Sequence, residues 1–259
     1  MPPALHAFRY WLKLYSRTWR GTIVISVVNP LLFLLGVGVG IGHLVNLSHP
    51  AHSAVLGGVS YSDFFAPGLL AAAMMQTAFI EGGGRVAQAA SPTGSYRAAA
   101  TTPMEPEEIL TGHMLFIGFR LITSSAAFIV VMELFGVVSG WWAFAVWPAA
   151  LLTGLAFAAP LASWTVTVRQ YNTINSLFRF VLMPMYMFSG TFFALSQLPH
   201  AIRLLASVLP LTQGVELCRS LSLGHPSVAG VAARSAYLLL FVVGGLLLAR
   251  VNFRRRLHG

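Results

Sequence analysis

Residues 188–224 read FSGTFFALSQLPHAIRLLASVLPLTQGVELCRSLSLG, a segment that is apolar throughout most of its length. It follows one long apolar run and precedes another, but Pro199 and Pro210 divide it into two short apolar pieces. A helix needs about 20 residues to cross the hydrocarbon core of a bilayer, so neither piece spans it. Non-helical backbone at membrane depth must pack against protein. We therefore expect a re-entrant helical hairpin over residues 195–224, just before the last span.

The composition is that of an integral membrane protein. Of 259 residues, 56% are hydrophobic and 9% are charged, whereas a soluble domain carries about 25% charged residues. The length predicts a single transmembrane domain over residues 1–259, with no separate soluble domain. The net charge of +9 does not indicate nucleic acid as a partner, because the basic residues lie at helix ends and not on one soluble face.

Apolar runs predict an all-α polytopic protein with six transmembrane helices. Strands of a membrane barrel would alternate in hydrophobicity, which these runs do not. The first run is too long for the apolar core of a signal peptide, about 7–15 residues, so we expect it to remain as a span. The runs cover residues 22–42, 64–80, 114–138, 141–168, 174–193 and 228–250.

The distribution of basic residues predicts the orientation in the cell membrane. With both termini on the cytoplasmic side, twelve of the sixteen Lys and Arg residues lie inside. Three lie outside, namely Arg203, Arg219 and Arg234, and Arg120 falls within a span. Because cytoplasmic segments carry the excess of basic residues, the sequence predicts that both termini are cytoplasmic.

Residues 5–20 have an aromatic face and a basic face. On a helical wheel Phe8, Trp11, Leu12, Tyr15 and Trp19 share one side, and Arg9, Lys13, Arg17 and Arg20 lie opposite. This pattern is typical of a helix in the headgroup plane of a bilayer. The alternative is a basic flank that serves only to set the topology.

Residues 82–112 form the largest internal polar segment, and the orientation makes it cytoplasmic. Gly82–Gly84 resembles a phosphate cradle, but no Lys, Ser or Thr partner follows, so we expect a hinge or a helix stop there. Thr102 and Pro103, followed by three glutamates at 105, 107 and 108, predict a helix start.

Several kinds of chemistry are excluded by residues that the chain lacks. The single lysine, Lys13, has no Walker context, so the chain cannot bind ATP in that way. Ser189 has no histidine in the later spans to act as a base, and Asp63 is the only aspartate. His43, His49 and His52 fit no standard zinc spacing. We therefore expect no enzyme activity, no metal and no cofactor in this chain, with Cys218 as a buried apolar residue.

Charges near the spans have structural interpretations. Arg120 and Glu133 are expected to reach the nearer membrane surface by snorkelling. Glu81 and Arg179 are expected to anchor helix ends, and Glu216 and Arg219 are spaced to form a local ion pair. An Asp, Glu or His at mid-membrane, which a proton-coupled transporter would need, is not predicted.

The motifs of the 189–219 region resemble those of membrane subunits of type-2 ABC exporters. They are Ser189-Gly190-Thr191-Phe192-Phe193, Leu198-Pro199, Leu209-Pro210-Leu211-Thr212, Val215-Glu216-Leu217 and Arg219. Nodulation-type lipo-oligosaccharide exporters and antibiotic-efflux permeases look nearest. The resemblance implies two copies of a partner ATPase that binds ATP and Mg, and a second, identical permease copy. It also implies an amphipathic substrate, such as a lipo-oligosaccharide, a glycolipid or a hydrophobic drug.

The resemblance and the patterns above assign four groups of site residues. Contact with the ATPase, through a coupling helix within residues 85–102, is expected for Arg85, Gln88, Arg97, Thr102 and Glu105. The interfacial helix contributes Trp11, Lys13, Tyr15, Arg17 and Trp19, and the outer gate Phe192, Phe193, Glu216 and Arg219. The substrate pathway contributes Met75, Phe79, Met187 and Phe188. A secondary transporter or channel that works without ATP, and a structural membrane-assembly protein, stay open as alternatives.

Overall fold

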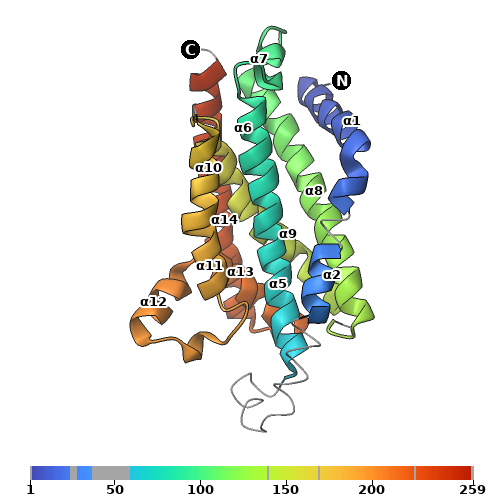
Figure 1. Cartoon of the computed structure of the whole chain (residues 1–259), viewed down its shortest axis with the longest axis vertical. Helices are drawn as coiled ribbons and strands as arrows, with labels where there is room; N and C mark the ends of the chain where they lie inside the picture. Colours follow the sequence, from blue (N-terminus) through green and yellow to red (C-terminus); the bar gives the residue numbers. More distant parts are fainter. Residues whose placement is uncertain are drawn as a thin grey trace.

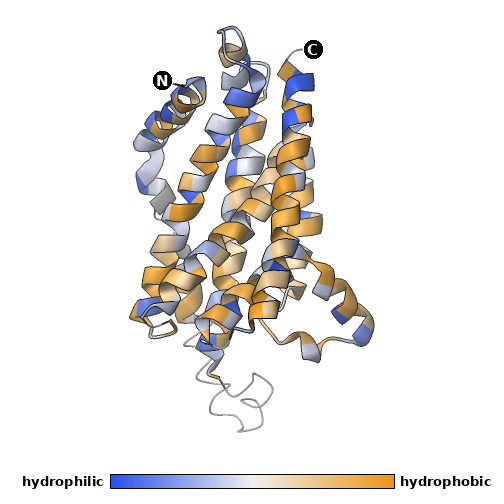
Figure 2. Ribbon diagram, turned by 180° about the vertical axis from the view of Figure 1, so that it is seen from behind, coloured by the Kyte–Doolittle hydropathy of each residue, from blue (hydrophilic) through white to orange (hydrophobic). Residues whose placement is uncertain are grey.

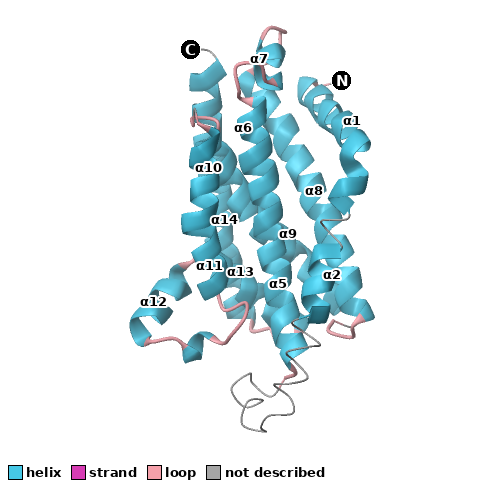
Figure 3. Ribbon diagram, viewed as in Figure 1, coloured by secondary structure: helices cyan, strands magenta, loops and turns pink. Residues whose placement is uncertain are grey.

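A computed structural model describes residues 2–23, 28–36, 59–138, 140–168, 170–224 and 226–257, and these residues form helices and no strands (Figure 3). The α-helices are α1 (Pro3–Ile23), α2 (Asn29–Phe33), α5 (Tyr61–Ala78), α6 (Val86–Ala89), α7 (Ser95–Ala100), α8 (Pro106–Leu134), α9 (Trp142–Thr165), α10 (Tyr171–Leu177), α11 (Met183–Phe188), α12 (His200–Val208), α13 (Pro210–Ser222) and α14 (Val228–Leu257). Two π-helical stretches, η3 (Phe79–Arg85) and η4 (Phe178–Leu182), and a 3₁₀ turn, η5 (Leu195–Gln197), complete the order. The predicted all-α class is confirmed for these residues.

The long helices form a bundle with two distinct ends. Helix α9 packs against α5, α8, α13 and α14. The N-terminus, the C-terminus and α7 lie together at one end, which we call the α7 end (Figure 1). Helices α12 and α13 lie toward the opposite end, which we call the α12 end. A chain that crosses the membrane an even number of times has both termini on the same side, as in this arrangement.

By length and hydropathy, four described helical segments can cross a membrane. They are Tyr61–Ala89, Pro106–Leu134, Trp142–Thr165 and Val228–Leu257. A fifth would be the pair α12 and α13, which is bent by 82° at Leu209. That bend supports the expected hairpin, because Pro210 starts α13 in a new direction. The expected first span, residues 22–42, lies largely outside the described residues. Where the fifth span is expected, at residues 174–193, the structure has a helical run over residues 171–188, and the first turns of this run are polar.

Of the hinge or helix stop expected at Gly82–Gly84, the helix stop is wrong, and the hinge stays a prediction. The helix that begins at Tyr61 runs through all three glycines as η3 and continues to Ala89. These glycines allow close packing instead: a Cβ on Gly82 would lie 2.9 Å from the carbonyl oxygen of Ala158 on α9. Tertiary packing therefore overrides the low helix propensity of glycine.

The predicted helix start near Glu105 is confirmed, with a consequence for Arg120. Glu105 caps α8, and its backbone N–H donates at 2.9 Å to the Glu108 carboxylate, which completes a capping box. Helix α8 begins at Pro106, eight residues before the expected span start at Met114. Arg120 consequently lies in the bundle interior, 3% exposed, so the expectation that it snorkels is wrong. Glu133, in the last turn, is exposed.

The core is apolar, and so is much of the outer surface. The main core joins α5, α8, α9 and α13, and a second cluster at the α7 end contains Trp11, Tyr96, Phe116 and Phe253. Apolar residues also cover the outward faces of the long helices, while the hydrophilic colour gathers at the C-terminal end of α14 (Figure 2). On α14 the exposed side chains include Leu240, Val243 and Leu247. An apolar outer surface of this kind suits lipid as the surrounding solvent.

Candidate functional site

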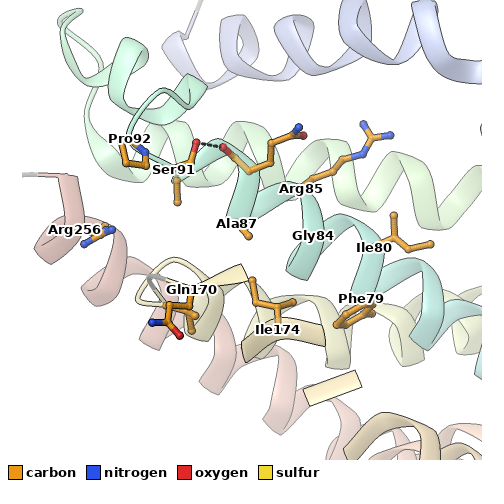
Figure 4. A pocket seen from close by; sticks show the side chains of 13 residues that line it. Phe79, Ile80, Gly84, Arg85, Ala87, Ser91, Pro92, Gln170, Ile174 and Arg256 are labelled. Atoms are coloured by element: carbon orange, nitrogen blue, oxygen red, sulfur yellow. Dashed lines mark hydrogen bonds between the residues drawn. The ribbon is translucent and has the colours of Figure 1, made fainter. Parts of the chain in front are cut away.

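A cavity of about 710 Å³ opens at the α7 end between the η3–α6 helix and α10 (Figure 4). Phe79 and Ile174 form an apolar side, and Gln88, Gln170 and Arg256 provide polar groups. Arg256 makes no ion pair with any residue that the structure describes. The cavity therefore combines an apolar wall with an available cation, which suits an amphipathic ligand with a polar or anionic head.

A smaller cavity of about 270 Å³ lies next to the first along the same pair of helices. It is lined by Gln76, Phe178, Met183 and Tyr186, among others. Phe79 lines the larger cavity and Phe178 the smaller one, and their ring centroids are 4.7 Å apart. The two cavities therefore lie on either side of a contact between these two rings.

The four residues predicted for the substrate pathway do not lie together. Phe79 lines the larger cavity, and Met75 is fully buried in the main core. Met187 and Phe188 are exposed on α11. The described residues therefore form no single surface that includes all four, and the pathway stays a prediction.

The five predicted coupling residues divide into three settings. Arg97 and Thr102 are exposed at the tip of the α7 end, which an ATPase could reach. Arg85 and Gln88 both line the cavity, and Glu105 caps α8. Arg85 points from η3 toward α8, where its guanidinium lies 5.4 Å from the centroid of the Phe116 ring (Figure 4).

Helix α7 is anchored by an aromatic cluster that the sequence analysis did not identify. The Tyr96 hydroxyl hydrogen-bonds Nδ1 of His113, and the Trp11 ring stacks on His113 with centroids 4.0 Å apart. Burial raises the pKa of Tyr96 well above its usual value, so the phenol stays neutral. We call Trp11, Tyr96, His113 and Phe116 the α7 anchor; it joins α1, α7 and α8. The one signal for this cluster in the sequence is the glycine at position 112: in the structure a Cβ there would lie 2.4 Å from Cβ of Ala7, so Gly112 marks a close approach of α1 and α8.

A buried ion network lies beside the α7 anchor. Nε of Arg120 donates to the Glu81 carboxylate at 3.0 Å, and Nε of Arg85 lies 2.8 Å from the other oxygen of Glu81. Arg120 also donates to the Tyr15 hydroxyl at 3.0 Å, with its guanidinium 4.7 Å from the centroid of that ring. This network ties α1, η3 and α8 together, and η3 leads directly into the cavity wall.

The residues predicted for the interfacial helix lie on α1 as expected from the wheel. Trp11 and Tyr15 face α8, where they take part in the α7 anchor and the ion network. Lys13 and Arg17 are exposed, and Trp19 is 44% exposed. The aromatic face is therefore largely engaged by protein, and the basic face is free to meet lipid headgroups.

At the α12 end, Arg219 holds the hairpin to α5. Its guanidinium donates to the carbonyl oxygens of Phe64 at 3.1 Å and Gly190 at 2.7 Å, and lies 3.8 Å from the centroid of the Phe64 ring. Gly190 has φ +81°, a conformation that favours glycine. Glu216 lies 3.4 Å from Arg219, so the expected local pair is present.

Two of the predicted outer-gate residues, Phe192 and Phe193, lie two and three positions after Gly190. The carbonyl of Phe192 accepts a hydrogen bond from the Tyr61 hydroxyl at 3.2 Å, and the Phe192 ring packs against Phe65 and Tyr186. Phe193 is partly buried beside it. Arg219 and Tyr61 thus fix both ends of the 190–192 turn.

Comparison with known proteins gives a consistent result. A family model described as ABC-2 type transporter matches residues 6–223. The chain is 28% identical to Nodulation protein J of Rhizobium leguminosarum bv. trifolii over 254 residues, which cover 95% of this chain and 94% of that protein. It is 26% identical to Nodulation protein J of Sinorhizobium fredii over 261 residues, covering 95% and 94% respectively. No solved structure matches the chain.

Proposed function

The chain belongs to the ABC-2 type transporter membrane family and is the non-catalytic, multi-pass membrane subunit of an exporter; from this premise we propose how it works. An amphipathic substrate enters at the cavity of the α7 end and leaves at the α12 end. Energy comes from ATP and Mg bound by two copies of a separate ABC ATPase. Among the substrates considered, a lipo-oligosaccharide is favoured by the similarity to Nodulation protein J; a glycolipid or hydrophobic drug is the alternative.

The observation that carries this proposal is the connection between α7 and the cavity. Exposed Arg97 lies next to Tyr96, whose buried ring is bonded to His113 on α8. The anchor contacts Arg85, one turn from the cavity residue Gln88. A push on α7 by an ATPase would therefore reach the cavity wall through packed side chains, as a coupling between two sites requires.

The proposed orientation has both termini and α7 in the cytoplasm. It is supported by the basic end of α14, where Arg254, Arg255 and Arg256 lie at the α7 end. Six transmembrane helices are proposed, with the first in the 22–42 region and with α12 and α13 as a re-entrant hairpin.

Cysteine labelling tests the orientation with little background, because the only cysteine, Cys218, is buried. Arg97→Cys on α7 and Leu205→Cys on α12 place an exposed thiol at each end of the bundle. In intact cells a membrane-impermeant maleimide should label position 205, and position 97 only after the membrane is opened. Labelling of position 97 from outside would overturn the orientation and the coupling role.

A second test addresses the ATPase. The chain should co-purify with a protein that carries a Walker motif, and Arg97→Glu should weaken that association while Arg203→Glu on α12 does not. Arg203 is a matched control, because it is also exposed but lies at the other end. Transport by the chain alone in vesicles without nucleotide would instead support the secondary-transporter alternative.

We also propose a second, identical copy of the chain in the assembly. The support is the exposed apolar side of η4 and α11, where Phe180 is 78% and Met187 57% exposed. This side adjoins both cavities, so a second copy there would close a shared pathway. Cross-linking between Met187→Cys copies is expected, and its absence at all positions of α11 would contradict this arrangement.

A further inference from the structure

A third pocket, separate from the two cavities described above, lies on the outer side of the bundle between α8 and α14. Its volume is about 500 Å³, and α9 contributes Leu155 to its floor. The walls are apolar and include Met114 and Ile122 on α8 and Leu246 on α14. Several wall residues are exposed, among them Leu115 at 46% and Ile122 at 40%, so this groove opens outward from the bundle.

The polar groups of the groove lie only at its α7 end. Arg250 on α14 and Thr111 on α8 line that end. One turn farther toward the α7 end, Arg254 and Glu107 form an ion pair at 2.8 Å, so the nearest carboxylate is already matched by a cation. Arg250 is exposed and makes no ion pair with any residue in the described ranges. The groove therefore has apolar walls and ends at a positive charge that no carboxylate of the described residues pairs with.

The dimensions of the groove match one leaflet of a bilayer. Along α8 it runs from Leu110 to Ile122, which at 1.5 Å per residue is about 18 Å. Half of the hydrocarbon core is about 15 Å. An acyl chain that enters beside Arg250 would therefore extend to about the middle of the membrane.

Gly118 keeps the groove open. It lies in the middle of the α8 wall, and a Cβ built on it would meet no atom within 4 Å. A larger side chain at position 118 would fit without a clash, so close packing of the helices does not require a glycine there.

We propose that this groove binds an anionic phospholipid from the leaflet on the α7 side, with an acyl chain along α8 and the phosphate on Arg250. Basic residues near a membrane surface attract anionic lipid by about 1 kcal/mol each, and burial of acyl carbons adds a non-selective contribution. The bound lipid would seal the gap between α8, which carries the ion network, and α14. Binding of this lipid would require neither the transported substrate nor the ATPase.

The test uses the full-length chain, purified, stripped of lipid and then mixed with equal amounts of phosphatidylglycerol and phosphatidylethanolamine with the same acyl chains. Native mass spectrometry counts the lipids retained. The unmodified chain should prefer phosphatidylglycerol, Arg250→Ala should lower that preference about fivefold, and Arg250→Lys should preserve it. Gly118→Leu, which fills the groove, should lower the retention of both lipids.

Gly244→Leu is the matched control for Gly118→Leu. Gly244 is also a helical glycine with no atom within 4 Å of a built Cβ, but it does not line the groove. The Gly244→Leu variant should retain as much lipid as the unmodified chain. An unchanged preference in Arg250→Ala would overturn the proposal, and so would unchanged retention in Gly118→Leu. Dissociation of a dimer by Gly118→Leu without lipid loss would show that a second copy fills the groove, which also overturns it.

Discussion

Two buried arginines, one toward each end of the bundle, are held in different ways. Arg120 at the α7 side is paired with a carboxylate, Glu81, which also pairs with Arg85. Arg219 at the α12 side is held chiefly by backbone carbonyls of Phe64 and Gly190, and its carboxylate partner Glu216 lies farther away, at 3.4 Å. The first joins three helices through side chains, and the second fixes the path of a turn.

This difference matters for the proposed mechanism. Side-chain ion pairs between helices keep their geometry only while the helices keep their positions, so the Glu81 network is sensitive to the arrangement of α1, η3 and α8. Carbonyl contacts depend on local backbone conformation, so Arg219 is sensitive to the shape of the turn after α11. The network suits the transmission of a push from α7, and Arg219 suits a gate that must return to one closed shape.

The largest loss of stability is expected for the variant Glu81→Gln. It leaves Arg85 and Arg120 without a carboxylate in the interior, and breaking a buried pair of this kind costs about 3–5 kcal/mol. The thermal midpoint of the purified protein in a fixed detergent should fall accordingly. Glu133→Gln is the control, because Glu133 is exposed at the end of the same helix that carries Arg120 and should change stability by less than about 0.5 kcal/mol.

A double variant separates the charge from the packing. Glu81→Met with Arg120→Met removes the carboxylate and the more buried of its two arginines. It should recover part of the stability that Glu81→Gln loses, because apolar replacement of a buried pair is often neutral, and the part not recovered is the cost of leaving Arg85 unpaired. Coupled transport should not recover, since the link to Tyr15 is gone. Equal stability of Glu81→Gln and Glu133→Gln would contradict the network.

Arg219→Lys tests the other side of the comparison. Lysine lacks the planar fork that reaches two carbonyls and stacks on Phe64. We expect a loss of about 2 kcal/mol, the scale of one hydrogen bond to a charged group. Hydrogen exchange should accelerate at residues 189–193 and stay unchanged at η3. The matched control is Arg203→Lys on α12, because Arg203 is exposed; if both variants exchange alike, Arg219 does not hold the turn.

Local features of the structure follow from the sequence more closely than the buried contacts do. The helix start at Glu105, the bend at Pro210 and the Glu216–Arg219 pair each depend on residues within a few positions of one another. The position of both termini at one end follows from the distribution of basic residues and the parity of the expected spans.

The buried network could not be predicted in the same way. Glu81 and Arg120 are 39 residues apart in the sequence. The pattern around each residue predicts only where that residue lies relative to the end of its own helix. Both residues lie deeper in the bundle than their expected spans indicate. The pattern predicts residues 82–112 as a polar cytoplasmic segment, whereas packing on α9 keeps Gly82 within the helix that begins at Tyr61, and the capping box starts α8 at Pro106. His113 was missed for the same reason, since it fell at the boundary of that segment.

Tyr15→Phe should lower the stability less than Glu81→Gln or Arg219→Lys. It removes the hydroxyl that accepts from Arg120 but keeps the ring over the guanidinium. The expected loss is about 1 kcal/mol, typical of a single hydrogen bond. Tyr10→Phe is the control on the same helix, because Tyr10 is 49% exposed. A loss equal to that of Glu81→Gln would mean that Tyr15, and not Glu81, is the main partner of Arg120.

The smallest effect is expected for Glu107→Gln, and it sharpens the contrast with Glu81. The Glu107–Arg254 pair has a similar distance, 2.8 Å, but its side chains are 36% and 62% exposed. Exposed pairs contribute about 0.2–1 kcal/mol, and screening at about 1 M salt, where the Debye length is about 3 Å, should remove most of that. The loss in Glu81→Gln should persist at the same salt, because its partners are buried. Thermal midpoints of both variants at low and high salt make the comparison, and a loss in Glu81→Gln that vanishes with salt would mean that water reaches the network.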